Sequence, residues 1–111
     1  MDILTETAAE RTIGKLKGRM DTLTTKTFDQ WFSNQMGQAR THLILDMSEL
    51  VYISSSGLRS LLAAAKQIKA ASGTLVLCGL TGVVRQVFEL SGFFTIFQVV
   101  DDIDKALQKT G

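Results

Sequence analysis

Residues 42–47, His-Leu-Ile-Leu-Asp-Met, form a nearly continuous apolar run in the middle of the chain. The run has the length of a β-strand, and its lack of alternation predicts a strand that is covered on both faces. A second run of this kind follows at Leu75 to Cys78. Because strands buried on both faces are typical of parallel sheets with helices packed on them, we expect an α/β fold.

The segment between these two runs has the clearest helical pattern in the sequence. Its apolar residues recur at i, i+3, i+4 and i+7 and so fall on one helix face; they are Leu58, Leu61, Leu62, Ala65 and Ile68. Ser72-Gly73 ends the predicted helix.

The remaining segments continue the alternation of strands and helices. We predict short strands at residues 2–7 and 10–17, joined at Ala8-Ala9, with Gly18 closing the second. A helix should run from Asp21 or Thr22 to about Gln38, with an apolar face made of Leu23, Phe28, Trp31, Phe32 and Met36. A last strand is expected at residues 95–99, and further helices at 82–90 and about 102–109.

This order, β-β-α-β-α-β-α-β-α, predicts right-handed crossovers and a mixed, mostly parallel sheet. About four helices should pack against the sheet, and the first hairpin should add an antiparallel pair.

The composition fits one cytoplasmic domain over residues 1–111. The chain is 45% hydrophobic and 21% charged, as in an average globular domain. Its net charge of +1, without a basic patch, argues against nucleic acid as a partner. The acidic start does not resemble a signal peptide, and Phe93 to Val100 is too short to cross a membrane. The single cysteine, Cys78, can form no internal disulfide, which fits a reducing compartment.

Metal and cofactor sites are not expected, and weak nucleotide binding is left open. The chain has one His, one Cys and only scattered carboxylates that could join them, namely Asp21, Asp46 and Glu49. It contains neither a GxGxxG nor a GxxxxGK[ST] motif. The amides of residues 79–82, Gly-Leu-Thr-Gly, could hold an anion, although a tight turn is the simpler interpretation.

The segment that joins the central strand to the clearest helix reads Ser54-Ser-Ser-Gly57. A serine at a helix start is commonly a cap, whose oxygen accepts a hydrogen bond from a free amide. A hydroxyl at this position is also a good place for a phosphate, because the free amides and the helix dipole favour negative charge. Use of a serine as a hydrolase nucleophile is disfavoured, since the GxSxG motif is missing and His42 belongs at the far end of the strand.

Four segments in order make the chain similar to the STAS domain family, in particular to the small bacterial anti-sigma factor antagonists. Gly18-Arg-Met-Asp21 resembles the family's GxLD at the first helix, and residues 43–62, LILDMSELVYISSSGLRSLL, resemble its most specific signature. Leu90-Ser-Gly92-Phe-Phe resembles the element before the last strand, and Ile103-Asp-Lys-Ala-Leu107 resembles the closing helix.

The resemblance implies a phosphorylation switch rather than an enzyme. In the family, an anti-sigma factor with a histidine-kinase-like ATPase fold phosphorylates the serine before [S/T]-G-L, which is Ser55 here. The unphosphorylated form binds this kinase and releases its sigma factor or another client, and a PP2C-type phosphatase resets the switch. Many members carry Asp where this chain has Ser54, so Ser54 and Ser56 remain as competing acceptors. If Ser55 points outward, Ser56 is the expected cap.

The partner surface is expected at the edge of the sheet where the parallel strands end. We expect it to contain Met20, Asp21, Thr22, Ser54, Ser56, Gly57, Leu58, Arg59, Leu80, Thr81 and Gly82. Leu58 would supply either apolar contact or core packing, and Arg59 could pair with an acidic group of the kinase. One alternative is a STAS subunit of a stressosome or a lipid-transport complex, without a cycle on this serine; a small serine hydrolase is the other.

Overall fold

The computed structural model describes residues 1–109, which form five strands and four α-helices. The strands are β1 (Asp2–Ala8), β2 (Arg11–Met20), β3 (His42–Ile53), β4 (Thr74–Cys78) and β5 (Gln98–Val100). The helices are α1 (Thr25–Gly37), α2 (Ser55–Ala70), α3 (Gly82–Leu90) and α4 (Ile103–Lys109), with a 3₁₀ turn at Phe93–Thr95. The predicted order of strands and α-helices is confirmed. Within residues 1–109, no helix has the length and apolarity needed to cross a bilayer.

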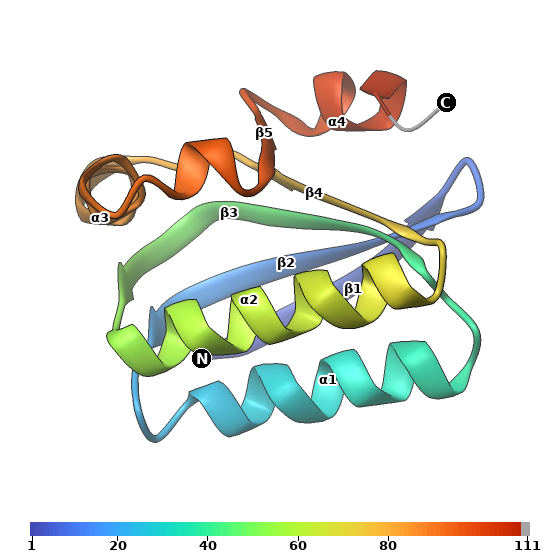
Figure 1. Cartoon of the computed structure of the whole chain (residues 1–111), viewed down its shortest axis with the longest axis horizontal. Coiled ribbons are helices and arrows are strands. Elements are labelled where there is room, and N and C mark those ends of the chain that lie inside the picture. Colours follow the sequence, from blue (N-terminus) through green and yellow to red (C-terminus); the bar gives the residue numbers. More distant parts are fainter. Residues whose placement is uncertain (110–111) are drawn as a thin grey trace.

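The strands lie side by side in the order β1-β2-β3-β4-β5 (Figure 1). β1 pairs with β2 antiparallel, and the other three pairings are parallel. The predicted mixed, mostly parallel sheet is therefore confirmed. Because β2, β3 and β4 are parallel, the segments that follow them leave from the same edge of the sheet.

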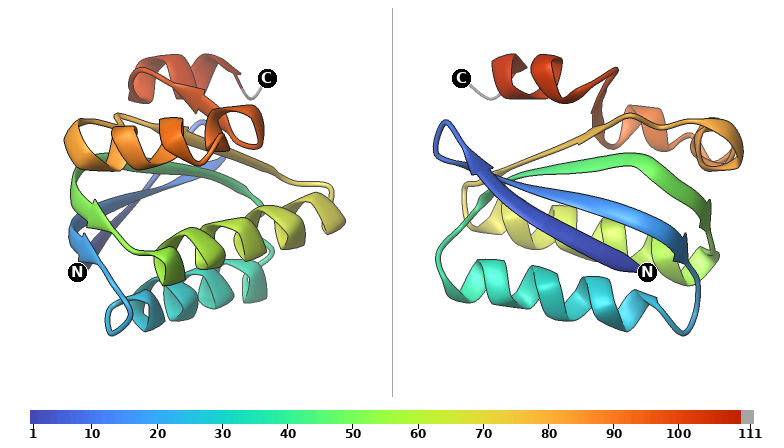
Figure 2. Two further views of the ribbon diagram at one scale, coloured as in Figure 1. Left: turned by 60° about the vertical axis from the view of Figure 1, so that its left-hand side comes forward. Right: turned by 180° about the vertical axis from the view of Figure 1, so that it is seen from behind.

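The two faces of the sheet are covered by different helices. α1 and α2 lie next to each other on one face, and α4 lies on the other (Figures 1 and 2). α3 adds Val84 and Phe88 to the core beneath α1 and α2. Ala106 of α4 packs with Ile44 and Val76 in a smaller core on the opposite face.

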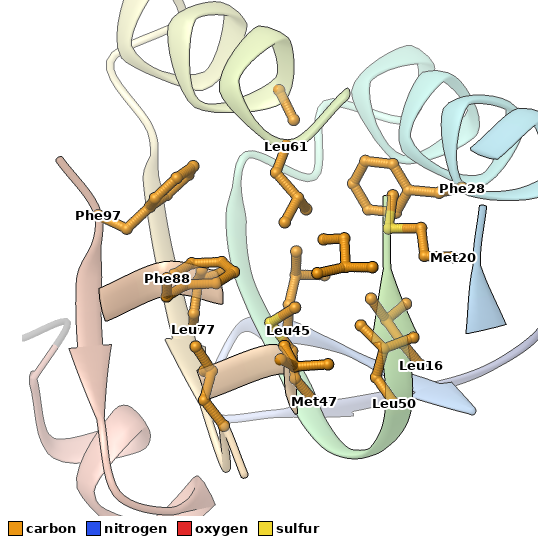
Figure 3. Packing of buried hydrophobic residues seen from close by; sticks show 14 of the residues in the cluster. Leu16, Met20, Phe28, Leu45, Met47, Leu50, Leu61, Leu77, Phe88 and Phe97 are labelled. Atoms are coloured by element: carbon orange, nitrogen blue, oxygen red, sulfur yellow. The ribbon is translucent and has the colours of Figure 1, made fainter. Parts of the chain in front are cut away.

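The larger core joins buried residues of the strands and helices (Figure 3). Among them, Leu45, Leu61 and Leu77 lie in the apolar runs and on the helix face that the sequence had marked. Leu45 and Leu77 point from β3 and β4 toward Leu61 of α2, and all three are fully buried. Burial of one such side chain stabilises the folded state by about 2 kcal/mol, so this core accounts for much of the fold's stability.

Two strands are longer than the sequence predicted. β2 continues past Gly18, where φ is +101° and the pairing with β3 shifts register, and ends at Met20. β3 continues past Met47 to Ile53, because its polar residues after Asp46 remain paired with β2. The prediction that Gly18 closes the strand was wrong, since glycine here permits a bulge rather than a stop.

Three further boundaries differ from the sequence prediction. α1 begins at Thr25, later than expected, and Leu23 is 83% exposed instead of facing the core. The last strand covers Gln98–Val100, because Phe93–Thr95 is taken up by the 3₁₀ turn. The first hairpin turns at Ala9 and Glu10, both at positive φ.

Candidate functional site

The serine segment forms the turn between β3 and α2, and Ser54 caps the helix. Ser54 has an extended backbone, and its Oγ accepts a hydrogen bond from the Gly57 amide at 3.2 Å. Its own amide donates to the Met20 carbonyl at 2.9 Å and so continues the pairing of β2 with β3. The expectation that Ser56 is the cap was wrong, because the helix begins at Ser55, two residues earlier than a cap at Ser56 would place it.

Ser55 and Ser56 lie in the first turn of α2 but in different surroundings. Ser55 is exposed, and its hydroxyl makes no side-chain hydrogen bond within residues 1–109. Ser56 is half-buried; its Oγ lies 3.4 Å from Thr22 Oγ1 and accepts a hydrogen bond from Arg59 Nη2 at 3.3 Å. Of the three serine hydroxyls, only that of Ser55 is both exposed and free of such contacts in the described part of the chain.

Gly57 is required by packing at the helix start. It is buried, and a Cβ placed on it would lie 2.8 Å from Ile53 Cγ1 and 3.1 Å from the Met20 carbonyl oxygen. Met20 is itself fully buried. Both residues were expected on the partner surface, but in the structure they are buried where α2 packs against the end of β2.

The loop between β2 and α1 is held by Asp21. Its Oδ1 accepts hydrogen bonds from the amides of Leu23 and Thr24, each at 3.0 Å, and from Thr24 Oγ1 at 3.1 Å. The bond from the Thr24 amide is the main reason that the pKa of Asp21 lies below its ordinary value. Asp21 therefore shapes the loop that carries Thr22 to the start of α2.

The start of α3 lies at the same side of the molecule, with the end of β3 between it and the start of α2 (Figures 1 and 2). Leu80 is buried, whereas Thr81 and Gly82 are exposed. Gly79 and Gly82 both have positive φ, which is typical of a tight turn. The structure thus brings Thr22 and the serine segment into contact and places residues 80–82 farther along the same edge.

A groove of about 450 Å³ runs between α1 and α2 beside the serines. Ser56 and Arg59 line it from α2, and Asp29 and Ser33 line it from α1. Leu58 is half-buried and packs against the larger core, so core packing accounts for part of its apolar spacing.

Three exposed apolar residues at this edge were missed by the sequence reasoning. Leu23 in the β2–α1 loop, Val51 near the end of β3 and Val83 at the start of α3 are 83%, 63% and 51% exposed. Leu23 had been assigned to the apolar face of the first helix, and Val51 lay beyond the predicted strand at residues 42–47. Neither a helical nor a strand periodicity predicts their exposure, because each lies near the end of an element or in a connection.

The other candidate ligands have partners within the fold. Asp46 Oδ1 accepts from the Ser48 amide at 3.0 Å, and Glu49 pairs with Lys15 at 2.7 Å. His42 lies at the opposite end of β3 from the serines, where Nδ1 is 3.0 Å from Thr74 Oγ1. Burial raises the pKa of the Cys78 thiol to about 12. No group of three or more metal-binding side chains occurs in residues 1–109.

Comparison with known proteins matches this sequence and architecture to one family. The sequence model described as STAS domain matches residues 2–106. A relative from Bordetella bronchiseptica, BtrV, is named as an anti-sigma factor antagonist and is 38% identical over 94 residues. The match covers 85% of this chain and 81% of BtrV.

Solved structures share the fold at low sequence identity. A Thermotoga maritima protein named as an anti-sigma factor antagonist has a TM-score of 0.92 at 17% identity, covering 97% of this chain and 93% of that chain. SpoIIAA of Bacillus, solved in its phosphorylated form, has a TM-score of 0.75 at 20% identity. That match covers 99% of this chain and 100% of SpoIIAA.

Proposed function

We propose that this protein, which belongs to the STAS domain family and to its anti-sigma factor antagonists, binds a partner. The binding is switched by phosphorylation of Ser55. The unphosphorylated form binds an anti-sigma factor that has a histidine-kinase-like ATPase fold, and binding releases a sigma factor or another client. Phosphorylation by that kinase ends the binding, and a PP2C-type phosphatase restores it. The protein is then a substrate and a binding module rather than an enzyme.

The hydroxyl of Ser55, which is exposed and makes no side-chain hydrogen bond in residues 1–109, is the observation that carries this proposal. A kinase must reach the oxygen and align it with the γ-phosphate, which an exposed residue in a first helical turn allows. Ser54 is less available because its oxygen caps the helix, and Ser56 because its oxygen contacts Thr22 and Arg59. This difference supports Ser55 over its two neighbours as the acceptor.

A phosphate on Ser55 would act mainly on the partner. It adds a charge of about −1.5 to −2 at a helix N-terminus, where free amides and the dipole favour an anion. The domain should therefore tolerate the modification, as the solved phosphorylated form of SpoIIAA illustrates for that protein. A partner packed over the start of α2 would have to desolvate the new charge, and this cost weakens the complex.

Incubation with ATP and the anti-sigma factor kinase of the same organism, followed by mass spectrometry, tests the phosphorylation site. Phosphate is expected on Ser55 of the wild type and of Ser56→Ala, and it should be absent from Ser55→Ala. A kinase that is active on itself or on a control substrate but leaves residues 54–56 unmodified would refute the proposal.

The binding half of the proposal is tested with Ser55→Asp and its neutral counterpart Ser55→Asn. The two side chains have nearly the same shape, so a difference between them reports the charge. Kinase binding by Ser55→Asp should be at least about tenfold weaker than by Ser55→Asn, a free-energy difference of about 1.4 kcal/mol. Equal affinities in calorimetry would contradict a charge-based switch.

A further inference from the structure

Arg59 is a cationic side chain at the switch whose role the proposed function leaves open. It is exposed on α2, and its Nη2 donates to Ser56 Oγ at 3.3 Å. Within residues 1–109 its guanidinium forms no ion pair, although Asp29 lines the same groove. The charge of Arg59 is therefore available to an incoming anion.

The geometry of α2 brings this charge close to Ser55. Arg59 follows Ser55 by four residues, so the two side chains are neighbours on the helix surface. The contact with Ser56 shows that the side chain of Arg59 leans back toward the helix start, as long helical side chains generally do. A negative group four residues before a positive one is also the more favourable orientation of such a pair.

We propose that Arg59 receives the phosphate of Ser55 and forms an ion pair with it within α2. The guanidinium offers a planar fork of N–H donors that matches two phosphate oxygens. To form the pair, it gives up one weak contact with the Ser56 hydroxyl. This inference rests on the proposed function, since it concerns the phosphorylated form of the same site.

The pair would make phosphorylation act twice on the partner surface. In the unphosphorylated protein, Arg59 lines the groove beside the serines and is free to meet an acidic group of the kinase. After phosphorylation, the same guanidinium is engaged on its own helix. The partner then meets a new negative charge and also loses a positive contact.

Phosphorus NMR of protein carrying phosphoserine at position 55 tests the pair. The residue is introduced by peptide ligation, so the measurement needs no kinase. In the wild type, the second pKa of the phosphate should lie below the ordinary value of about 6. Arg59→Gln should raise this pKa by about 0.3 pH unit or more, as expected for loss of an i,i+4 ion pair, and Arg59→Lys should restore part of the shift.

Arg40→Gln is the matched control. It removes the same charge from an exposed residue in the α1–β3 loop, at the opposite edge of the sheet. The other charged groups near this site are Asp29, which lines the same groove, and Arg19 and Asp21 at the end of β2 and just after it; they are the same in all variants. An unchanged phosphate pKa in Arg59→Gln, or an equal change in Arg40→Gln, would overturn the pair and leave the proposed function standing. Failure of the kinase to modify Ser55 would refute the proposed function but would not affect this measurement.

Discussion

At the scale of single residues, Ser54 and Ser55 are adjacent but have different roles in the fold. Ser54→Ala removes the oxygen that accepts from the Gly57 amide. We expect it to lower the free energy of unfolding by about 1 kcal/mol, the usual effect of losing a helix cap. Ser55→Ala removes an exposed hydroxyl without a side-chain partner in residues 1–109, and it should change the stability by less than about 0.5 kcal/mol.

Urea denaturation of both variants measures this difference, with circular dichroism following the loss of helix. Equal destabilisation by the two substitutions would contradict the assignment of Ser54 as the cap. A large loss in Ser55→Ala alone would show that its hydroxyl has a structural role.

Gly57 allows a second prediction at this scale. In Gly57→Ala, the new methyl group would approach Ile53 Cγ1 and the Met20 carbonyl oxygen too closely, and neither buried neighbour can move freely. We expect a net destabilisation of about 1–3 kcal/mol, because the overpacking exceeds the gain in helix propensity. Gly37→Ala is the control: nothing lies within 4 Å of a Cβ there, so this variant should be neutral or slightly stabilised. Thermal denaturation that ranks Gly57→Ala at or above Gly37→Ala would refute the explanation.

The sequence was sufficient to locate the serine segment but not to assign each serine. All three residues are serines and are equally good caps by type, so the residue type alone cannot say which of them caps the helix. Backbone pairing determines which serine is the cap. The amide of Ser54 still donates to the Met20 carbonyl of β2, so the helix can begin only after Ser54. That contact is 34 positions away in the sequence, and no local pattern encodes it.

At the scale of secondary-structure elements, the turn between β2 and α1 depends on the ionisation of Asp21. Its pKa lies below the ordinary value, so its hydrogen bonds stabilise the turn fully above the unfolded pKa of about 3.9. This stabilisation is lost as the pH falls through the lower folded pKa. We therefore expect the amide signals of Leu23 and Thr24 in NMR spectra to shift below pH 3.9, together with faster amide exchange.

Asp21→Asn is the control for this titration. Its side chain keeps one carbonyl acceptor but no longer ionises, so the acid-dependent change at Leu23 and Thr24 should largely disappear. A midpoint above pH 3.9 in the wild type would contradict the direction of the shift.

Predictability differs among the elements for physical reasons. α3 was predicted at its observed bounds, Gly82–Leu90. A glycine marks its start in the sequence, and its buried residues, Val84 and Phe88, are four positions apart, as one helix face requires. α1 was predicted to begin too early because Asp21 and Thr22 are good cap residues by type. In the structure, Asp21 instead accepts hydrogen bonds within the β2–α1 loop, and the helix begins only at Thr25. The extension of β3 was missed because Ser48 and Glu49 break its apolar run, while pairing with β2 keeps the strand extended.

At the scale of the whole molecule, the parallel connections determine where the candidate site lies. β2, β3 and β4 end at one edge, so three segments that are distant in the sequence reach the same side of the molecule. This convergence could be predicted from the order of elements alone. The exposed apolar residues there, Leu23, Val51 and Val83, could not, since their exposure depends on the final course of the chain.

The unequal covering of the sheet predicts unequal local stability. α4 has seven residues and packs with β5, a three-residue strand at the edge of the sheet, over the smaller of the two cores. α2 has sixteen residues and contributes Leu61, Ala64 and Ile68 to the larger one. Because a helix as short as α4 is unstable without its packing, α4 should open locally while the rest of the molecule stays folded.

Hydrogen exchange followed by mass spectrometry tests this difference. Peptides covering residues 103–109 should exchange well before those covering residues 61–68, because α4 opens locally without global unfolding. Addition of the anti-sigma factor should slow exchange at the start of α2 but leave α4 unchanged, because α4 lies on the opposite face of the sheet from α1 and α2. Equal exchange in the two helices would mean that the molecule unfolds as one cooperative unit. Slower exchange of α4 in the presence of the partner would contradict the prediction that the partner binds at the start of α2.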